Sequence, residues 1–414
     1  MTEFARAVGE WLDALPRGMD PDAMPGWMRR GREFGPGVVP VLEALWAAPQ
    51  PARRTKAVRA ALYQLDRQSE ARYFPHDWCA YQRATTPAKA KQVPPDTGCL
   101  TLAPPPTTQD LSNFATPLAA LPELVAVRIE SGAPQSLDFL TGTRALESLE
   151  LPKFRTRLDL AALGALRSLR HLRIGEAKHV ATEAVGAAVG LRSLAWEGPP
   201  AELDMLAPLD ALTYLRLERF AGTELGAAGD RPALETLRLE SGSRLTTLDS
   251  LGAAKASLRD VSVGFSAKLD DASALAGAGR LERLTLRQLP SLRDVGWLPR
   301  LPGLRALSLV KCSRLTDVAV VGELTTLTHL TLVDMPALPS LDFLTGLRDL
   351  RHLDLAGTRI ADGSYAPLHG LPHLLTVDGW MLKGDEIPAL RRALPQVVFN
   401  GLEAYARDPA GAPG

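Results

Sequence analysis

Residues 304–315 read LRALSLVKCSRL, and the spacing of their leucines decides the fold of the whole chain. The same pattern, L-x-x-L-x-L, returns about every 23 residues from the first third of the sequence almost to its end. Its second leucine marks thirteen positions: Val127, Leu149, Leu172, Leu194, Leu215, Leu237, Val261, Leu284, Leu307, Leu330, Leu353, Val377 and Val397. Successive markers are 20 to 24 residues apart, which indicates a stacked repeat with one adjustable loop.

The two leucines of L-x-L alternate with an outward residue, as in a β-strand. No repeat can bury its own leucines, so neighbouring repeats must stack on both sides, and the end repeats need caps. We therefore expect an α/β solenoid whose concave face is a parallel sheet of about 12–13 strands. The segments between strands contain Gly and Pro, as in VGWLPRLPG at residues 295–303, which predicts short helical turns.

The repeat at residues 304–315 resembles the cysteine-containing form of the leucine-rich-repeat family, L-x-x-L-x-L-x-x-C-x-x-L, and Thr316-Asp317 continues the match. The repeat that begins at Leu350, LRHLDLAGTRIAD, is similar to the shorter repeats of bacterial internalin-like proteins. The resemblance covers residues 100–400 and implies a leucine-rich-repeat horseshoe from a bacterium. It implies no particular ligand, because this fold serves many binding tasks.

The chain departs from that family at the ninth position of the repeat, where Asn or Cys is usual. Cys312 matches there, but the whole chain has only two asparagines, Asn113 and Asn400. A continuous asparagine ladder is therefore absent, and the backbone groups of the turns need other partners. We expect backbone N–H groups to donate to a recurring set of carboxylates. These are Asp271, Asp294, Asp317 and Asp362.

The first 95 residues lack the repeat and show helical spacing instead. Val8, Trp11 and Leu12 fall on one face of a helix that ends before Pro16, and residues 38–48 and 51–73 predict two more helices. The proline-rich segment 85–106 reads as a linker. We expect a helical domain or cap at 1–95, the solenoid at 96–400 and a flexible tail at 401–414.

The composition excludes several classes of protein. The 47 basic and 47 acidic residues balance, which argues against a general nucleic-acid binder. The first residues lack the apolar core of a signal peptide, and no stretch approaches the length of a membrane span, so we expect a cytoplasmic protein. Cys79, Cys99 and Cys312 are too few and too scattered for a disulfide framework or a zinc site, and no cofactor or metal is expected.

Catalytic motifs such as a phosphate loop, G-x-S-x-G, H-E-x-x-H or C-x-x-C do not occur in the sequence. The nearest cluster is His76-Asp77-Trp78-Cys79, but residues so close in sequence seldom reach triad geometry. We therefore expect no catalytic residues. A second cluster joins His329 and His352, which hold the same strand position in adjacent repeats and should lie about 5 Å apart. A solvated polar surface is the favoured interpretation, with metal binding or pH sensing left open.

The outward residues of the strands form columns along the concave face. Three arginines and three glutamates lie side by side in its N-terminal half, with Tyr214 at the edge, whereas Ser308, Val310, Thr331 and Val333 make a smaller and less polar surface further along. Mixed charge favours a folded protein or a peptide over a polyanion. The residues predicted to bind the partner are Arg173, Glu197, Tyr214, Arg216, Glu218, Arg238, Glu240, Arg287, His329, His352 and Asp354.

These patterns together predict a non-enzymatic intracellular scaffold that binds a protein or peptide partner, and not nucleic acid, on the concave face. Two alternatives stay open. One is an effector or enzyme whose repeats select a substrate for an active N-terminal domain, and the other is an inhibitor or immunity protein that neutralises a toxin or an enzyme. The sequence decides neither the partner, nor the cellular process, nor the oligomeric state.

Overall fold

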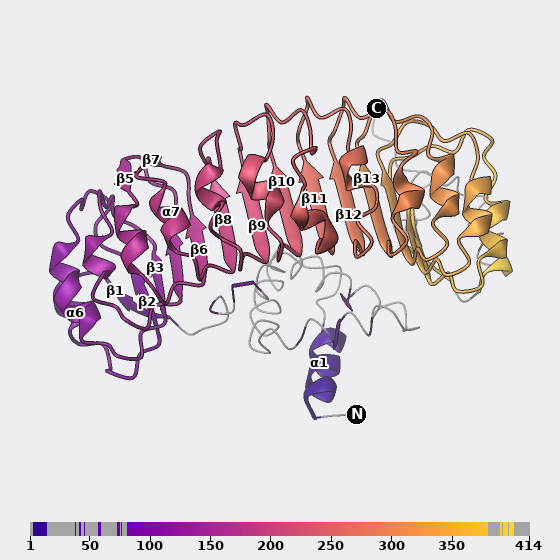
Figure 1. Ribbon diagram of the computed structural model, residues 1–414. Helices are drawn as coiled ribbons and strands as arrows, with labels where there is room; N and C mark the ends of the chain where they lie inside the picture. The colour runs from indigo at the N-terminus through magenta and orange to yellow at the C-terminus, as the bar shows by residue number, and fades with distance from the viewer. Residues whose placement is uncertain are drawn as a thin grey trace, which may run out of the picture.

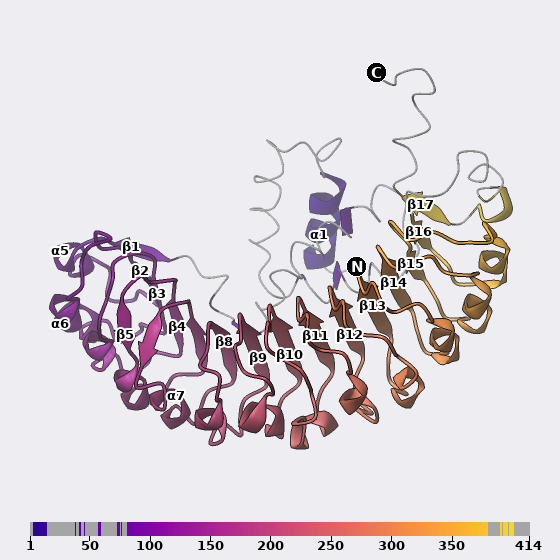
Figure 2. The ribbon, with the colours of Figure 1, turned by 90° about the horizontal axis from the view of Figure 1, so that it is seen from above.

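The computed structural model describes residues 3–14, 38, 41–42, 45, 57–58, 73–74, 76, 81–379, 390, 392–395 and 397–400. Within these residues, fifteen strands form one parallel sheet. The sheet bends into an arc, with the strands on its concave side and short helical turns on its convex side (Figures 1 and 2). The described part of the chain therefore has the predicted horseshoe architecture.

The strands of this sheet are β1 (Gln82–Ala84), β2 (Cys99–Leu102), β3 (Ala126–Ile129), β4 (Ser148–Leu151), β6 (His171–Ile174), β8 (Ser193–Glu197), β9 (Tyr214–Glu218), β10 (Thr236–Glu240), β11 (Asp260–Gly264), β12 (Arg283–Arg287), β13 (Ala306–Val310), β14 (His329–Val333), β15 (His352–Asp354), β16 (Thr376–Asp378) and β17 (Val398–Asn400). A separate pair consists of β5 (Arg157–Asp159) and β7 (Lys178–Val180).

The helical elements are short, as expected for the return segments. The α-helices are α1 (Glu3–Asp13), α5 (Pro87–Ala90), α6 (Ala115–Ala119) and α7 (Ala184–Ala187). The 3-10 helices are η4 (Ser112–Phe114), η5 (Asp138–Leu140), η6 (Ala161–Ala165), η7 (Asp204–Leu206), η8 (Gly226–Asp230), η9 (Ala253–Ala256), η10 (Ser273–Leu275), η11 (Leu298–Arg300), η12 (Ala319–Glu323), η13 (Asp342–Gly346) and η14 (Ala366–Gly370).

The strand register confirms the predicted repeat. Every marker from Val127 to Leu353 pairs with the marker of the next repeat. The last prediction is wrong, because Val377 pairs with Phe399 and not with Val397. Both candidates are buried, since a shift of two residues along a strand keeps the same face.

The sheet starts earlier than predicted, and this accounts for its greater number of strands. Leu100 pairs with Val127, and Gln82 pairs with Leu100, so β1 and β2 precede the first predicted strand. The expectation of a linker at 85–106 is wrong, because this segment contains α5 and the fully buried strand β2. The expected boundary at residue 96 therefore falls inside the first unit of the sheet.

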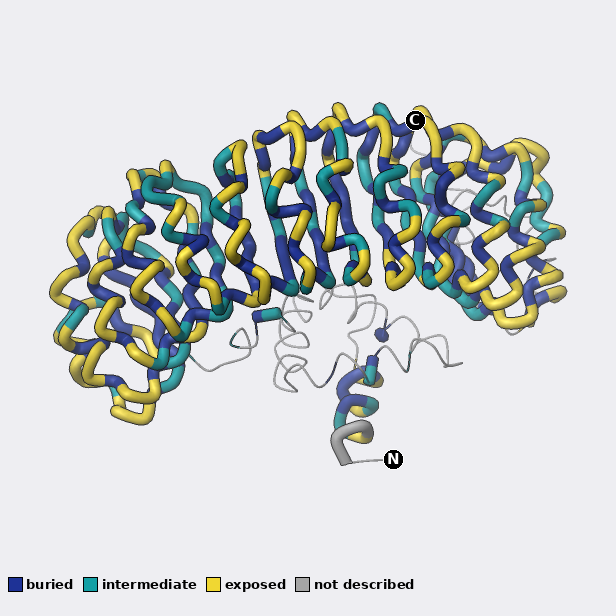
Figure 3. Tube along the Cα trace, in the orientation of Figure 1, coloured by how far each residue is buried: buried dark blue, intermediate teal, exposed yellow. Residues whose placement is uncertain are grey.

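The core is a continuous stack of leucines between the sheet and the convex turns. Leu215, Leu237 and Leu239, like the other inward leucines of L-x-L, are almost completely buried. Figure 3 shows the resulting alternation of buried and exposed segments along the arc. Because each layer is covered only by its two neighbours, the stability of the solenoid depends on contacts between adjacent repeats.

The predicted role of the recurring aspartates is confirmed. In each case one carboxylate oxygen accepts the backbone N–H of the residue two positions later, which closes a short turn before the helical segment. The four bonds run from Ser273 to Asp271 (2.7 Å), from Gly296 to Asp294 (2.8 Å), from Ala319 to Asp317 (2.9 Å) and from Ser364 to Asp362 (2.9 Å).

A left-handed residue follows the strand in eight successive repeats, with φ between 50° and 72°. These residues are Gly198, Arg219, Ser241, Phe265, Gln288, Lys311, Asp334 and Gly357. Six of the eight are not glycine, although this region of φ favours glycine. The ladder stabilises the conformation, because the N–H of Arg219 donates to the carbonyl of Glu240 at 2.8 Å and that of Lys311 donates to the carbonyl of Val333 at 2.9 Å.

Helix α1 confirms the first helix expected near the N-terminus, and its Val8, Trp11 and Leu12 are buried. It lies on the concave side of the arc (Figure 2). Most of the other two expected helices, the expected tail at 401–414 and Cys79 lie outside the described residues. No helix in the described part of the chain is long and apolar enough to cross a bilayer.

Candidate functional site

The predicted columns of charged residues exist on the concave face. Strand register brings Arg173, Ala195, Arg216 and Arg238 into one row across β6, β8, β9 and β10. A parallel row joins three glutamates: Glu197, Glu218 and Glu240. We call strands β4 to β12 the charged half of the face and strands β13 to β16 the C-terminal half.

The charges of the charged half are paired within the protein. Arg216 donates to Glu218 at 2.7 Å, and Arg287 donates to Glu240 at 3.0 Å. Further ion pairs join Arg128 to Glu150 (2.6 Å), Arg173 to Glu150 (4.0 Å) and Arg238 to Asp260 (3.5 Å). Partly exposed pairs of this kind contribute about 1 kcal/mol or less each. They therefore add little to the stability of the solenoid.

A hollow of about 170 Å³ opens among these ion pairs. It lies where Ala195 and Gly175 interrupt the rows of long side chains, and Arg173 and Arg216 stand on either side of Ala195. Gly175 is required here, because a Cβ atom at this position would lie 2.3 Å from the carbonyl carbon of Pro152. The volume resembles that of a protein cavity that accepts a benzene-sized group, so the hollow has room for about one side chain.

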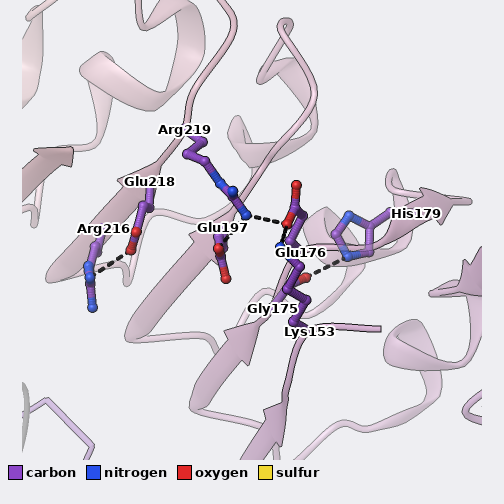
Figure 4. Close-up of polar contacts among 8 residues, drawn as sticks. All are labelled: Lys153, Gly175, Glu176, His179, Glu197, Arg216, Glu218 and Arg219. Carbon is purple, nitrogen blue, oxygen red and sulfur yellow. Dashed lines mark hydrogen bonds and ion pairs between the residues drawn. The ribbon is translucent and has the colours of Figure 1, made fainter. Parts of the chain in front are cut away.

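One rim of the hollow carries a small network of charges (Figure 4). Arg219, at a left-handed position, donates to Glu197 at 2.5 Å and also contacts Glu176, which pairs with Lys153. The hydrogen bond from Lys153, together with the charge of Arg219, holds the pKa of Glu176 below its usual value. Glu176 therefore carries its negative charge at neutral pH.

Below this rim, a histidine supports the base of the hollow. The Trp196 indole N–H donates to Nδ1 of His179 at 3.4 Å, so Nε2 carries the histidine hydrogen and donates to the Gly175 carbonyl at 3.0 Å. Burial lowers the pKa of His179, which agrees with a neutral ring. These contacts hold in place two residues that line the hollow, Gly175 and Trp196.

An aromatic pair from the N-terminal part of the chain covers one edge of the charged half. The Tyr73 ring stacks on Tyr214 with centroids 4.5 Å apart, and its hydroxyl shares a hydrogen bond of 2.6 Å with the Thr236 hydroxyl. The Phe74 ring meets Tyr214 edge-on at 5.8 Å and lies 3.8 Å from the guanidinium carbon of Arg173. Tyr214 was expected at the open edge of the surface, but it is completely buried beneath this pair.

Neighbouring residues extend this contact along the edge. His76 Nε2 lies 3.7 Å from a carboxylate oxygen of Glu147, and the Tyr81 ring lies 4.6 Å from the guanidinium carbon of Arg128. Burial lowers the pKa of His171 to about 4. His76 therefore contacts the solenoid, whereas the rest of the cluster His76-Asp77-Trp78-Cys79 lies outside the described residues.

The histidine pair of the C-terminal half is confirmed in position. The rings of His329 and His352 stack with centroids 4.5 Å apart. The expected solvated surface is wrong for His352, which is buried and shares a hydrogen bond of 2.9 Å with the Thr376 hydroxyl. Burial, with a smaller effect of Arg351 and Arg283, lowers the pKa of His329 to about 4. Asp354 accepts the backbone N–H of Ala356 at 3.0 Å.

The sequence analysis did not identify the aromatic pair or the hollow. The dipeptide Tyr73-Phe74 was a visible signal in a chain with only 6% aromatic residues. Its contact with Tyr214 was not predictable, because the two segments lie more than a hundred residues apart in the sequence. Among the described residues, no group of three or more His, Cys, Asp or Glu side chains is placed to hold a metal ion.

Comparison with known proteins defines the fold. No protein-family model and no curated protein matches the sequence. Among solved structures, an internalin (InlF) from Listeria monocytogenes matches with a TM-score of 0.57 and 18% identity, over 76% of this chain and 88% of that protein. A leucine-rich-repeat protein of Leptospira interrogans gives a TM-score of 0.46 and 16% identity, over 77% of this chain and 99% of its own. Internalin C2 of L. monocytogenes gives a TM-score of 0.40 and 22% identity, over 47% of this chain and 83% of its own.

The InlF match shows that this chain has the leucine-rich-repeat fold, as its repeats predicted. The chain therefore belongs to a fold class in which a curved solenoid presents a long parallel sheet on its concave face.

Proposed function

We propose that this protein is a non-enzymatic scaffold that binds a protein or peptide partner on the charged half of its concave face. The observation that supports this most directly is the hollow between Arg173 and Arg216, surrounded by ion pairs that are half-exposed. The hollow accepts one anchoring side chain of the partner. The surrounding arginines and glutamates then exchange their internal pairs for complementary charges, which selects the partner and its orientation.

The alternation of charge favours a protein over a polyanion. Nucleic acid would approach Arg216 and Arg238 but would also meet Glu218 and Glu240 in the adjacent column, and like charges repel across such a short distance. A folded protein or a peptide carries both signs of charge and can match both columns. Binding rather than catalysis is further supported by the chemistry of the hollow, whose charged side chains are ion-paired arginine, lysine and glutamate.

We also propose that the protein works in the cytoplasm. Cys312 is a buried free thiol, and burial raises its pKa above the usual value. An inert, buried thiol of this kind is compatible with a reducing compartment, where disulfides are rare.

The test uses the purified full chain as bait in lysate of its source organism. A variant with Arg173→Glu, Arg216→Glu and Arg238→Glu is compared with a matched variant with Arg293→Glu, Arg314→Glu and Arg348→Glu. The matched arginines are exposed and lie in the segments between strands, so both variants undergo the same change of net charge. Retained proteins are quantified by mass spectrometry after circular dichroism has shown that both variants are folded.

We expect the concave variant to retain at least tenfold less of the partner, because each reversal places a negative charge opposite an acidic group of the partner. The matched variant should retain the partner as the wild type does. Equal retention by both variants would contradict binding on the charged half.

A further inference from the structure

The aromatic pair Tyr73-Phe74 occupies a defined patch at the edge of the charged half. The first outward positions of four adjacent strands lie in one row: His171, Ser193, Tyr214 and Thr236. Together with Arg173 they form what we call the tyrosine patch. Ser193 and Thr236, on either side of Tyr214, are small, so the Tyr214 ring stands higher than its neighbours and presents a face to the aromatic pair.

The tyrosine patch recognises the aromatic pair in three different ways. Tyr214 stacks on Tyr73 at 4.5 Å, the Arg173 guanidinium lies 3.8 Å from the centre of the Phe74 ring, and the Thr236 hydroxyl bonds to the Tyr73 hydroxyl at 2.6 Å. Aromatic stacking and cation–π contact both become stronger when the groups are removed from water. The hydrogen bond adds specificity, because it requires a tyrosine hydroxyl at the first position of the aromatic pair.

The degree of burial matches that of an interface core. Phe74 and Tyr214 are 2% and 0% exposed, and Thr236 and Ser193 are each 1% exposed. Buried tyrosines and arginines that are surrounded by polar residues are typical of the residues that dominate binding at protein interfaces. The surrounding charged half supplies that polar rim.

We propose that the tyrosine patch is a docking site for a partner segment that presents two consecutive aromatic residues, the first a tyrosine, and that Tyr73-Phe74 occupies this site in the free protein as an intramolecular competitor. This proposal rests on the function proposed above, since the patch shares Arg173 with the hollow. A partner segment docked on the patch therefore continues directly into the hollow.

The competition has a predictable strength. A tethered competitor acts at an effective concentration of about a millimolar or more, and the affinity of an external ligand falls by the fraction of protein whose site is open. Removal of Tyr73 and Phe74 should therefore increase the affinity for an external aromatic segment by at least tenfold.

The experiment uses a fluorescent peptide with the sequence of residues 71–78, ARYFPHDW, and measures its binding by fluorescence anisotropy. The proteins are the full-length wild type, the double variant Tyr73→Ala and Phe74→Ala, and the control Tyr81→Ala. Tyr81 packs on Arg128 and lies outside the tyrosine patch. A second peptide carries alanine in place of its tyrosine and phenylalanine.

We expect the double variant to bind the aromatic peptide at least tenfold more tightly than the wild type and the Tyr81→Ala control, and to bind the alanine peptide at least tenfold more weakly. The absence of binding to the folded double variant would overturn the proposal. So would equal affinities of the wild type and the double variant, or of the two peptides. If the double variant does not fold, Tyr73→Leu keeps an apolar side chain, loses the stacking and the hydrogen bond, and should show the same direction of change.

One further variant separates the two proposals. Arg216→Glu lies at the hollow but outside the tyrosine patch, so it should reduce retention of the partner from lysate and leave the peptide affinity of the double variant unchanged. Loss of peptide binding on Arg216→Glu would place the peptide in the hollow and overturn the assignment to the patch.

Discussion

The two halves of the concave face are built on the same repeated strand but differ in what their outward side chains do. In the charged half, long side chains reach across repeats, as Arg287 does to Glu240, and the aromatic pair covers Tyr214. In the C-terminal half, the same row continues with Val310 and Val333, which carry no charge, and the contact between strands comes from the stacked rings of His329 and His352 in another row. The backbone ladder and the leucine core are common to both halves.

This difference distinguishes the residues that hold the solenoid together from the residues that form its surface. Because the core pattern is identical in both halves, the outward positions are available for function wherever the ladder does not need them. The charged half uses them for an aromatic contact and a hollow, so substitutions there should affect stability and binding more strongly than substitutions in the C-terminal half.

The largest effect is expected from Tyr214→Ala. Its ring is completely buried under Tyr73 and Phe74, and removing a buried aromatic ring costs about 3–5 kcal/mol. Thr331→Ala, at an outward position of the C-terminal half, should change stability by less than about 0.5 kcal/mol. Urea unfolding measures the loss of stability in both variants. In the Tyr214→Ala variant, hydrogen exchange should show faster opening of β8–β10 than of β13–β15. Equal losses from the two substitutions would mean that the halves do not differ in stability.

A smaller effect is expected from acidification, and it should act on both halves. The pKa of His171 in the charged half and that of His329 in the C-terminal half are each lowered to about 4 by burial. In the unfolded chain both take up a proton below pH about 6.5, so the unfolded state binds more protons and the folded state loses stability as the pH falls from about 6.5 to about 4.

Each histidine should account for a loss on the order of 2 kcal/mol over this range. His171→Gln and His329→Gln should each remove their own share of the pH dependence, as measured by unfolding at a series of pH values. If one variant keeps the pH profile of the wild type, its histidine takes up a proton as readily in the folded state as in the unfolded state. The two halves would then differ in their response to acid.

The smallest effect is expected from Glu240→Gln, which keeps the shape of the side chain and removes its charge. Its partner Arg287 lies 3.0 Å away in a half-exposed pair, so the loss should be about 0.5–1 kcal/mol at low salt and should disappear at high salt. Ser308→Ala in the C-terminal half provides the control without a charge. Thermal unfolding at two salt concentrations checks both, and a loss independent of salt would indicate packing instead of charge.

The sequence predicted the local features of the fold well. Marker spacing placed twelve of the strands in register, and the aspartates Asp271 and Asp317 were assigned their turn bonds correctly. The missed features follow from weaker local signals. β1 has no leucine, and the L-x-L of β2 (Leu100 and Leu102) lies within the segment that its prolines marked as a linker. The pattern at Val397 allowed two positions on the same face, of which Phe399 is the one that pairs.

The sequence predicted the rows of the candidate site but not their accessibility. Arg173, Arg216 and Arg238 lie in one row, as expected, with Ala195 between the first two. From sequence alone, Tyr214 and His352 are outward residues like Arg283 or Thr331, yet both are buried. Outward orientation is a property of strand alternation, whereas burial depends on what else the chain places in front of the strand.

By itself, the sequence determined the solenoid, the register of the repeats and the composition of the concave columns. These are local properties, because each leucine layer contacts only the layers before and after it. The tertiary structure alone decided which outward residues are open. Ala195 and Gly175 become the base of a hollow, and Tyr73 and Phe74 cover Tyr214. The last contact joins residues far apart in the chain, and no repeat period specifies such a pairing.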